Sequence, residues 1–330
     1  MTSFSILDLA MVTEGASPGD ALRRATGAAQ EAEDLGFHRF WMAEHHGMEN
    51  VASAATAVAL AHVAASTRHI RIGAGGIMLP NHAPLTIAEQ FGTLAALHPG
   101  RVDLGLGRAP GSDMRVARAL RRGMHSDPDA FPRDVMELQA LFRGDPDLGI
   151  KAVPGAGEQV EMWILGSSLF GAQLAALLGL PFAFASHFAP DHLDAALALY
   201  RQEFRPSATL DRPHVMCAMG LYVADTDEDA RAMASSMERI FVELHTTGAA
   251  RPLVPPDANY RATLPAAVGA MLDRLMSAAA IGSPALVKKQ IGSFLDRTNA
   301  DEIIFSSAIY DPMAAARARF LAAEICNEFQ

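Results

Sequence analysis

The sequence is poor in the residue types that build disulfide-bonded and membrane-embedded proteins. Only two of its 330 residues are cysteines, Cys217 and Cys326, and their wide separation argues against a disulfide framework or a cysteine-based metal site. No apolar run approaches the roughly 18 residues that a membrane-spanning helix requires. The first ten residues lack the basic start of a secretion signal. We therefore expect a cytoplasmic protein.

Positive charge is also scarce. Lys and Arg together number 27 against 37 Asp and Glu, and the formal net charge is −10 at pH 7. Nucleic-acid binding requires a basic surface, so this class of partner is excluded. The chain also lacks an HExxH zinc motif, a Walker loop, a nucleophile elbow and a GxGxxG fingerprint. Its nearest approach to the last, Gly105-Leu106-Gly107, has no third glycine and does not open a helix.

What the chain does contain is a regular alternation of strand-like and helical segments. Such alternation indicates a parallel sheet, and eight units favour closure into a barrel. We predict a single domain over residues 1–330, an α/β TIM (β/α)8 barrel with insertions after strands 4 and 7. The expected strands cover residues 4–9, 39–43, 70–76, 102–106, 161–165, 182–186, 215–224 and 302–307.

Two successive strands carry glycines, which have no side chain, near their C-terminal ends. In an α/β barrel these ends form the active face. The third strand carries Gly75 and Gly76, and a glycine pair inside a strand indicates a bulge or a close approach of the backbone to another group. The fourth ends in Gly107 and the cation Arg108. The pattern predicts that a large, flat ligand lies across these ends.

The second strand ends in Glu44-His45-His46. On an extended chain the first and third of these side chains point one way and His45 points the other. A metal site would need further ligands at a suitable spacing, and no such motif is present. A histidine at the mouth of a barrel is better suited to donate and accept protons. A purely structural, hydrogen-bonded histidine is the alternative.

A second candidate site lies where the fifth strand gives way to a helix, at Gly166-Ser167-Ser168. Hydroxyl groups and free backbone N–H groups at a helix N-terminus bind phosphate, aided by the helix dipole. An ordinary serine N-cap is the structural alternative. Arg108, one strand away, would supply the counter-charge and favours a phosphate site.

Residues 246–265 contain four prolines and little periodicity. Structureless loops of about 20 residues are uncommon inside a compact domain and are often active-site lids. A loose surface connection is an equally good interpretation of the segment.

Several motifs occur together and in order along nearly the whole chain. They are FWMAEHHG (40–47), IRIGAGGIMLPNHAP (70–84), HPGRVDLGLGRAPGSD (98–113), WILGSSLFGAQLAALLGLPFAFASHF (163–188) and a late GSP (282–284). In this combination the chain resembles the bacterial luciferase-like family of flavin-dependent monooxygenases, and within it the single-chain alkanal-monooxygenase-like group.

The resemblance implies a TIM barrel that binds FMN at the C-terminal ends of its strands. Members of the family use reduced flavin and dioxygen to oxidise an aldehyde or another organic substrate, and a separate reductase usually supplies the reduced flavin. His45 matches the family's catalytic histidine, and Gly75-Gly76 matches a non-prolyl cis peptide. The expected cofactor-binding residues are Glu44, Gly75, Gly76, Gly107, Arg108, Asp113, Gly166, Ser167 and Ser168. The expected substrate-pocket residues are His46, His187 and Phe188.

The chain departs from the luciferases at two positions. Gly107 replaces a reactive cysteine, and Ser167 replaces a glutamate of the phosphate loop, so light emission is not expected. A dehydrogenase or reductase of the same fold that uses FMN or a deazaflavin remains an alternative, as does a flavin-binding protein without turnover. We also expect a homodimer. The sequence does not name the organic substrate.

Overall fold

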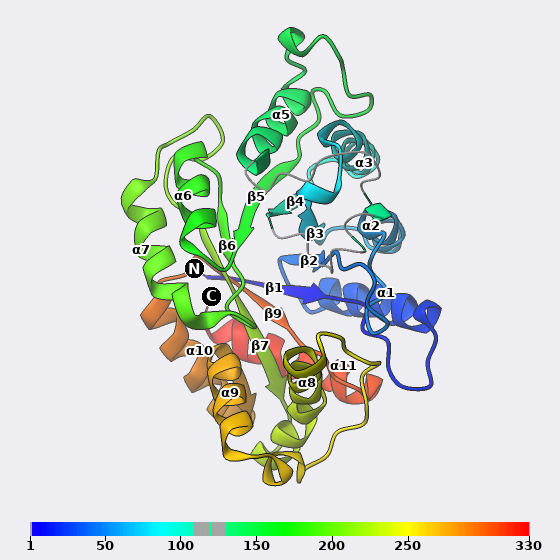
Figure 1. Cartoon of the computed structure of the whole chain (residues 1–330), viewed down its shortest axis with the longest axis vertical. Helices are drawn as coiled ribbons and strands as arrows, with labels where there is room; N and C mark the ends of the chain where they lie inside the picture. The colour runs from blue at the N-terminus through cyan, green and yellow to red at the C-terminus, as the bar shows by residue number, and fades with distance from the viewer. Residues whose placement is uncertain (1, 109–115, 117–118, 121–129, 330) are drawn as a thin grey trace.

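The protein was analysed as a computed structural model, which describes residues 2–108, 116, 119–120 and 130–329. Eight parallel strands close into a barrel and helices surround it, so the structure is a TIM barrel (Figure 1). The strands are β1 (Ser3–Asp8), β2 (Arg39–Met42), β3 (Arg71–Met78), β4 (Val102–Gly107), β5 (Glu161–Gly166), β6 (Phe182–Phe184), β7 (Val215–Val223), β8 (Ala279–Gly282) and β9 (Glu302–Ser306).

The barrel order follows the sequence from β1 to β7, and β9 closes the ring by pairing with both β7 and β1. The eight expected strands are therefore all present. The sequence analysis did not predict β8, a four-residue strand that pairs only with the last four residues of β7. It lies beside the ring and leaves the barrel at eight strands.

Helices cover the outside of the barrel. They are α1 (Pro18–Asp34), α2 (Thr56–Ser66), α3 (Pro84–Leu97), α5 (Phe131–Arg143), α6 (Leu169–Leu178), α7 (Leu193–Glu203), α8 (Asp227–Thr247), α9 (Ala266–Leu275), α10 (Pro284–Thr298) and α11 (Pro312–Cys326). The first begins with a capping box, in which Ser17 and Asp20 satisfy each other's backbone N–H groups before a proline at the first turn. The sequence analysis did not predict α9 and α11. In the described residues, no helix has both the length and the apolar character needed to cross a membrane.

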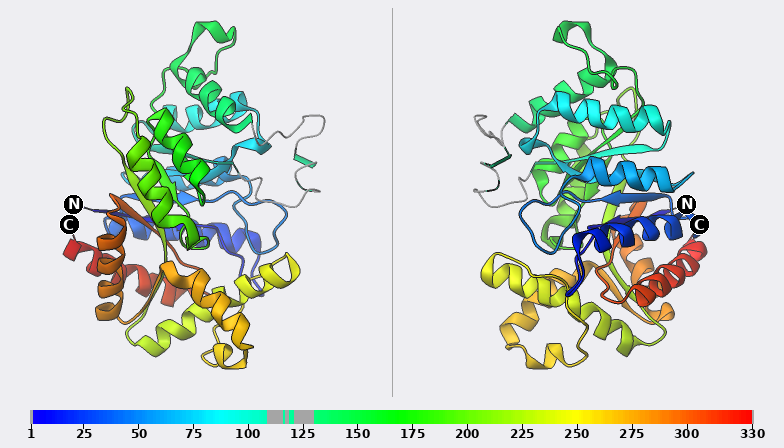
Figure 2. Two further views of the ribbon diagram at one scale, coloured as in Figure 1. Left: turned by 60° about the vertical axis from the view of Figure 1, so that its left-hand side comes forward. Right: turned by 90° about the vertical axis from the view of Figure 1, so that its right-hand side faces the viewer.

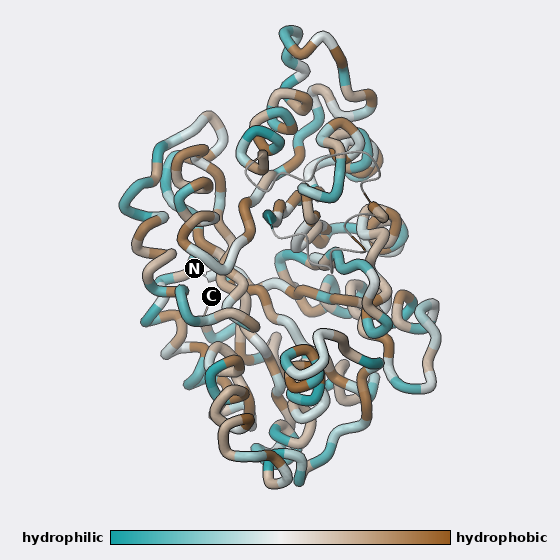
Figure 3. Tube along the Cα trace, viewed as in Figure 1, coloured by the Kyte–Doolittle hydropathy of each residue, from teal (hydrophilic) through white to brown (hydrophobic). Residues whose placement is uncertain are grey.

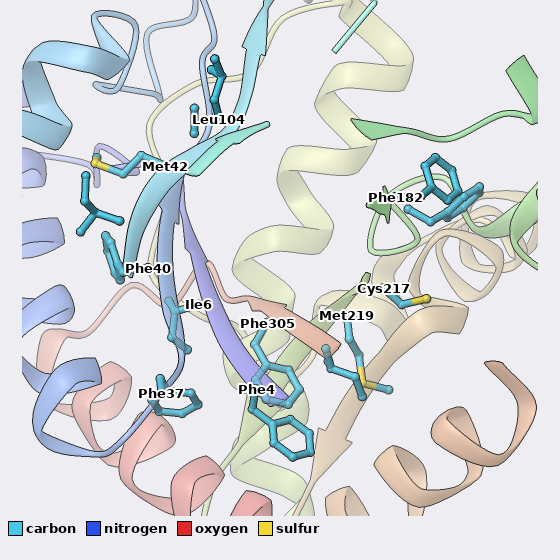
Figure 4. Packing of buried hydrophobic residues seen from close by; sticks show 14 of the residues in the cluster. Phe4, Ile6, Phe37, Phe40, Met42, Leu104, Phe182, Cys217, Met219 and Phe305 are labelled. Carbon is cyan, nitrogen blue, oxygen red and sulfur yellow. The ribbon is translucent and has the colours of Figure 1, made fainter. Parts of the chain in front are cut away.

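Alternation along the strands divides the apolar residues into two cores. Phe4, Ile6 and Phe305 point outward and pack against the helices, and the rings of Phe4 and Phe305 stack with centroids 5.8 Å apart (Figure 4). Leu7 and Trp41 point inward and fill the barrel. The hydropathy trace accordingly shows apolar segments along the central strands (Figure 3).

Buried charges close the N-terminal end of the barrel. Arg39, at the start of β2, lies 2.9 Å from Asp103 of β4 and 3.1 Å from Glu302 of β9. Both termini lie together at one edge of the molecule, whereas the segment after α8 lies at the opposite side (Figure 2). The charged plug holds the strand starts together and leaves the C-terminal ends as the open mouth.

Residues 251–259 are held in place rather than loose. Leu253 is fully buried, donates its N–H to the carbonyl of Val12 at 2.8 Å and accepts from the N–H of Glu14 at 2.8 Å. The interpretation of this segment as a loose surface connection is therefore wrong. Whether it acts as a lid stays a prediction.

Candidate active site

The predicted site residues lie in or just after five consecutive strands of the barrel. Glu44, His45 and His46 follow β2, Gly75 and Gly76 lie in β3, Gly107 ends β4, Ser167 and Ser168 follow β5, and His187 lies just beyond β6. Because all strands run parallel, these positions share the C-terminal rim.

Glu44 organises the part of the rim between β2 and β3. It is 1% exposed, and its Oε1 accepts hydrogen bonds from the Nε2 atoms of His46 (2.6 Å) and His82 (2.8 Å). Its Oε2 accepts from the backbone N–H of Met78 at 3.1 Å. One buried carboxylate thus joins the ends of two strands. His82, which lies in the NHAP stretch after β3, was not among the residues predicted from the sequence.

The same three side chains could hold a metal ion. Their ligand atoms on Glu44, His46 and His82 all lie within 4.8 Å of one another, and one of the three residues is buried. However, both imidazole Nε2 atoms point at a single carboxylate oxygen at hydrogen-bonding distance. Hydrogen bonds therefore explain the arrangement without a metal, and they place His46 in this cluster.

His45 lies close enough to His187 for the charges of the two rings to interact. Burial and the neighbouring His45 lower the pKa of His187 to about 4. His187 is therefore neutral at physiological pH.

A cation and a helix N-terminus meet between β4 and α6. The guanidinium carbon of Arg108 lies 4.2 Å from the ring centroid of Phe170, in the first turn of α6. Ser168 is the N-cap residue, and its hydroxyl makes no capping hydrogen bond within the described part of the chain. The structural alternative for this serine is therefore not observed. Free N–H groups beside a fixed cation form an arrangement suited to an anion.

The glycines of the rim differ in what surrounds them. The Gly75–Gly76 peptide is cis and β3 has a register shift there against β4, so both expectations for this pair are confirmed. A Cβ on Gly75 would lie 2.8 Å from the ring of Trp41, and one on Gly76 would lie 2.6 Å from the carbonyl oxygen of Gly105. Barrel packing therefore already accounts for the missing side chains at both positions. A contact of this pair with a cofactor stays a prediction.

Gly107 fits the ligand explanation better. Of the described atoms, only the carbonyl oxygen of Ile77, at 3.8 Å, lies near the position of an added Cβ. Among the described residues, Gly107 therefore has more room beside it than Gly75 or Gly76. Asp113, the remaining predicted cofactor contact, lies outside the described residues.

A cavity of about 230 Å³ reaches the rim, and of the three predicted substrate-pocket residues only His187 lines it. His46 faces Glu44, and Phe188 is 47% exposed, with its ring edge-on to His187 at 4.7 Å. The cavity includes Leu9, Met11, Met237 and Phe241, which the sequence analysis did not single out. They lie in the loop after β1 and on α8, where local patterns do not reveal which side chains face the mouth.

The structure is thus a TIM barrel whose C-terminal rim carries His45 and, between β4 and α6, the cation Arg108 beside a helix N-terminus. Comparison with known proteins shows its family. Residues 2–301 match the family described as luciferase-like monooxygenase, and the chain belongs to this family of flavin-dependent monooxygenases.

Named relatives support the assignment. The chain is 48% identical over 327 residues to a luciferase-like monooxygenase of Escherichia coli (strain K12), which covers 99% of this chain and 97% of the relative. It is 35% identical over 251 residues to N-acetyl-S-alkylcysteine monooxygenase of Bacillus subtilis (strain 168), covering 74% of each chain. The crystal structure of apo-MsnO8 superimposes with a TM-score of 0.92 at 32% identity, covering 99% of each chain.

Proposed function

We propose that this protein is the oxygenase of a two-component system, which uses reduced FMN and dioxygen to oxidise a small organic substrate. The single observation that carries the proposal is the position of Arg108, stacked on Phe170 beside the uncapped N-terminus of α6, on the same rim as His45. An anion-binding corner near an acid–base histidine fits a phosphate-bearing cofactor with its reactive end at the barrel mouth.

Each rim residue has a role in this proposal. Arg108, Ser167 and Ser168 bind the FMN phosphate, with Gly166 allowing the loop to approach. The flavin ring lies over Gly107, where the rim is open. Asp113 lies beside the flavin. The barrel backbone at Gly75 and Gly76 forms the floor under the ring.

In this proposal His45 is the residue that donates and accepts protons. Bound reduced FMN supplies two electrons, so that one oxygen atom enters the substrate and the other leaves as water. His45 gives and takes the protons that this exchange requires at the mouth of the barrel. Glu44 supports it indirectly, because its bonds to His46, His82 and the Met78 N–H fix the adjoining turns.

The remaining parts of the proposal concern partners. The sequence contains no dinucleotide fingerprint, so we propose that a separate reductase supplies the reduced flavin. We further propose that the protein is a cytoplasmic homodimer. An aldehyde is one candidate for the organic substrate.

Titration of the protein with FMN, riboflavin and a deazaflavin tests the proposal. We expect FMN to bind most tightly, and the complex with reduced FMN to consume oxygen. Preferential binding of the deazaflavin with no oxygen consumption would instead support a hydride-transferring dehydrogenase or reductase. Tight FMN binding without either reaction would support a flavin carrier.

A further inference from the structure

His187 presents a polar atom that the protein itself does not use. It lies in the short loop after β6, and within the described part of the chain its buried Nδ1 has no hydrogen-bond partner. The loop is well anchored, because Ser186 donates its hydroxyl to the carbonyl of Ala218 at 2.6 Å and Ala185 donates its N–H to Gly166 at 3.0 Å. Leaving a buried polar atom unpaired costs about 1–3 kcal/mol, so a ligand partner is the natural explanation.

The cavity that His187 lines has apolar residues in its wall. They include Leu9 and Met11 of the loop after β1 and Met237 and Phe241 of α8. Methionine side chains adapt their shape to different apolar ligands. The cavity therefore offers an adaptable apolar wall and, in His187, one hydrogen-bonding group.

Charged groups also line the cavity, but on the outer side of the strands. Asp8 follows Leu7 of the inner core and lies on the same face of β1 as Ile6 of the outer core. Arg24 and Arg319 come from α1 and α11, outside the barrel, and Arg319 is bonded to Glu31 at 2.9 Å. These charges belong to the layer between strands and helices rather than to the mouth.

The charge state of His187 also limits its ligand. Burial, with the neighbouring His45, lowers the pKa of His187 to about 4, so the ring is neutral at pH 7. A neutral imidazole forms ordinary hydrogen bonds and does not compensate a ligand charge. Transferring an ionised group into such surroundings without a partner is strongly unfavourable.

Building on the proposed function, we propose that His187 is a specificity-determining residue, whose Nδ1 hydrogen-bonds the single polar group of a compact, uncharged substrate of the carbonyl type. The apolar remainder of that substrate packs against Leu9, Met11, Met237 and Phe241. Size supports the same class. The cavity of about 230 Å³ is smaller than the roughly 300–1,000 Å³ of pockets for drug-sized ligands. Long-chain substrates are therefore disfavoured.

Binding of cyclohexanone to the FMN complex tests the proposal, with two analogues as controls. Methylenecyclohexane has the same shape without the oxygen, and cyclohexanecarboxylate carries a charge. Three variants probe the histidine. His187→Asn keeps an amide near the Nδ1 position, His187→Gln places it near the Nε2 position, and His187→Leu removes hydrogen bonding.

We expect His187→Leu and His187→Gln to lower the affinity for cyclohexanone by roughly threefold to tenfold, the usual contribution of a neutral hydrogen bond. His187→Asn should stay close to wild type, and methylenecyclohexane should not distinguish the four proteins. The proposal is overturned if wild type does not bind cyclohexanone, if all four proteins bind it equally, or if cyclohexanecarboxylate binds more tightly.

The result remains separable from the proposed function. If wild-type protein does not bind FMN, the proposed cofactor is wrong, and the same titrations are made on the protein without flavin. An unchanged pattern among the variants would then support His187 as the binding residue, and equal affinities would overturn it. Melting temperatures of the three variants show whether each one is folded.

Discussion

The guanidinium of Arg108 lies over the ring of Phe170, with 4.2 Å between its central carbon and the ring centroid. Arg108 follows β4 and Phe170 belongs to the first turn of α6, so the contact places a cation next to a helix N-terminus. A guanidinium held by an aromatic ring keeps N–H groups that can bind an anion.

Replacing Arg108 should therefore weaken binding of the flavin phosphate without weakening binding of the flavin ring. We expect Arg108→Ala to weaken FMN by roughly tenfold to a hundredfold, because a charge-assisted hydrogen bond contributes about 1.5–3 kcal/mol. Riboflavin, which has no phosphate, should bind as to wild type. Titration of both ligands provides the measurement, and equal losses would show that Arg108 supports the fold or the ring instead.

Two glycines of the rim should respond in opposite ways. Among the described atoms, only the carbonyl oxygen of Ile77 lies near the Cβ that Gly107→Val adds, so we expect a near-normal melting temperature and strongly weakened FMN binding. Gly76→Ala forces a Cβ to within 2.6 Å of the Gly105 carbonyl oxygen and should cost about 1–3 kcal/mol of stability or more. Thermal unfolding and FMN titration of both variants check this. If Gly107→Val binds FMN with normal affinity, the flavin ring does not lie over Gly107.

The Glu44 cluster should depend on its negative charge. In Glu44→Gln, two histidine donors lose a carboxylate acceptor, and hydrogen bonds to charged groups contribute about 1.5–3 kcal/mol each. We therefore expect a drop of several degrees in melting temperature. Wild-type protein should melt at the same temperature with and without EDTA. A lower melting temperature in EDTA would identify the cluster as a metal site.

His187 should make folding stability depend on pH. Its folded pKa of about 4 lies below the ordinary value of 6.5, so the unfolded chain binds the proton more readily. The stability that depends on a neutral His187 is fully present above pH 6.5 and is lost as the pH falls toward 4. Between pH 7 and pH 5, we expect the free energy of unfolding of wild type to fall by up to about 2 kcal/mol more than that of His187→Leu. Urea unfolding at both pH values measures the difference, and parallel losses would contradict the burial of this ring.

Much of this architecture is predictable because it depends on local patterns. Strand periodicity and the parallel order place residues 44–46, Gly107 and Ser168 on one rim without further information. Other features depend on contacts between distant residues. The bond from His82 to Glu44 spans 38 residues and requires the ends of β2 and β3 to align.

The glycine pair of β3 shows the same limit. Its missing side chains reflect Trp41 on one neighbouring strand and Gly105 on the other, which periodicity within β3 cannot reveal. Likewise β8 was missed because a four-residue strand with a single partner leaves little alternation to detect.

Stopped-flow absorbance of the bound flavin tests the central claim most directly, that His45 handles protons for reduced FMN and oxygen. Reduced-FMN complexes of wild type, His45→Ala and His62→Ala are mixed with oxygenated buffer, His62 being an exposed histidine of α2. We expect His45→Ala to retain FMN affinity within a few-fold but to change the rate of flavin reoxidation by about 10²–10⁴, the usual effect of losing a general acid or base. His62→Ala should match wild type. Equal rates in all three proteins would contradict the account and make His45 a structural residue.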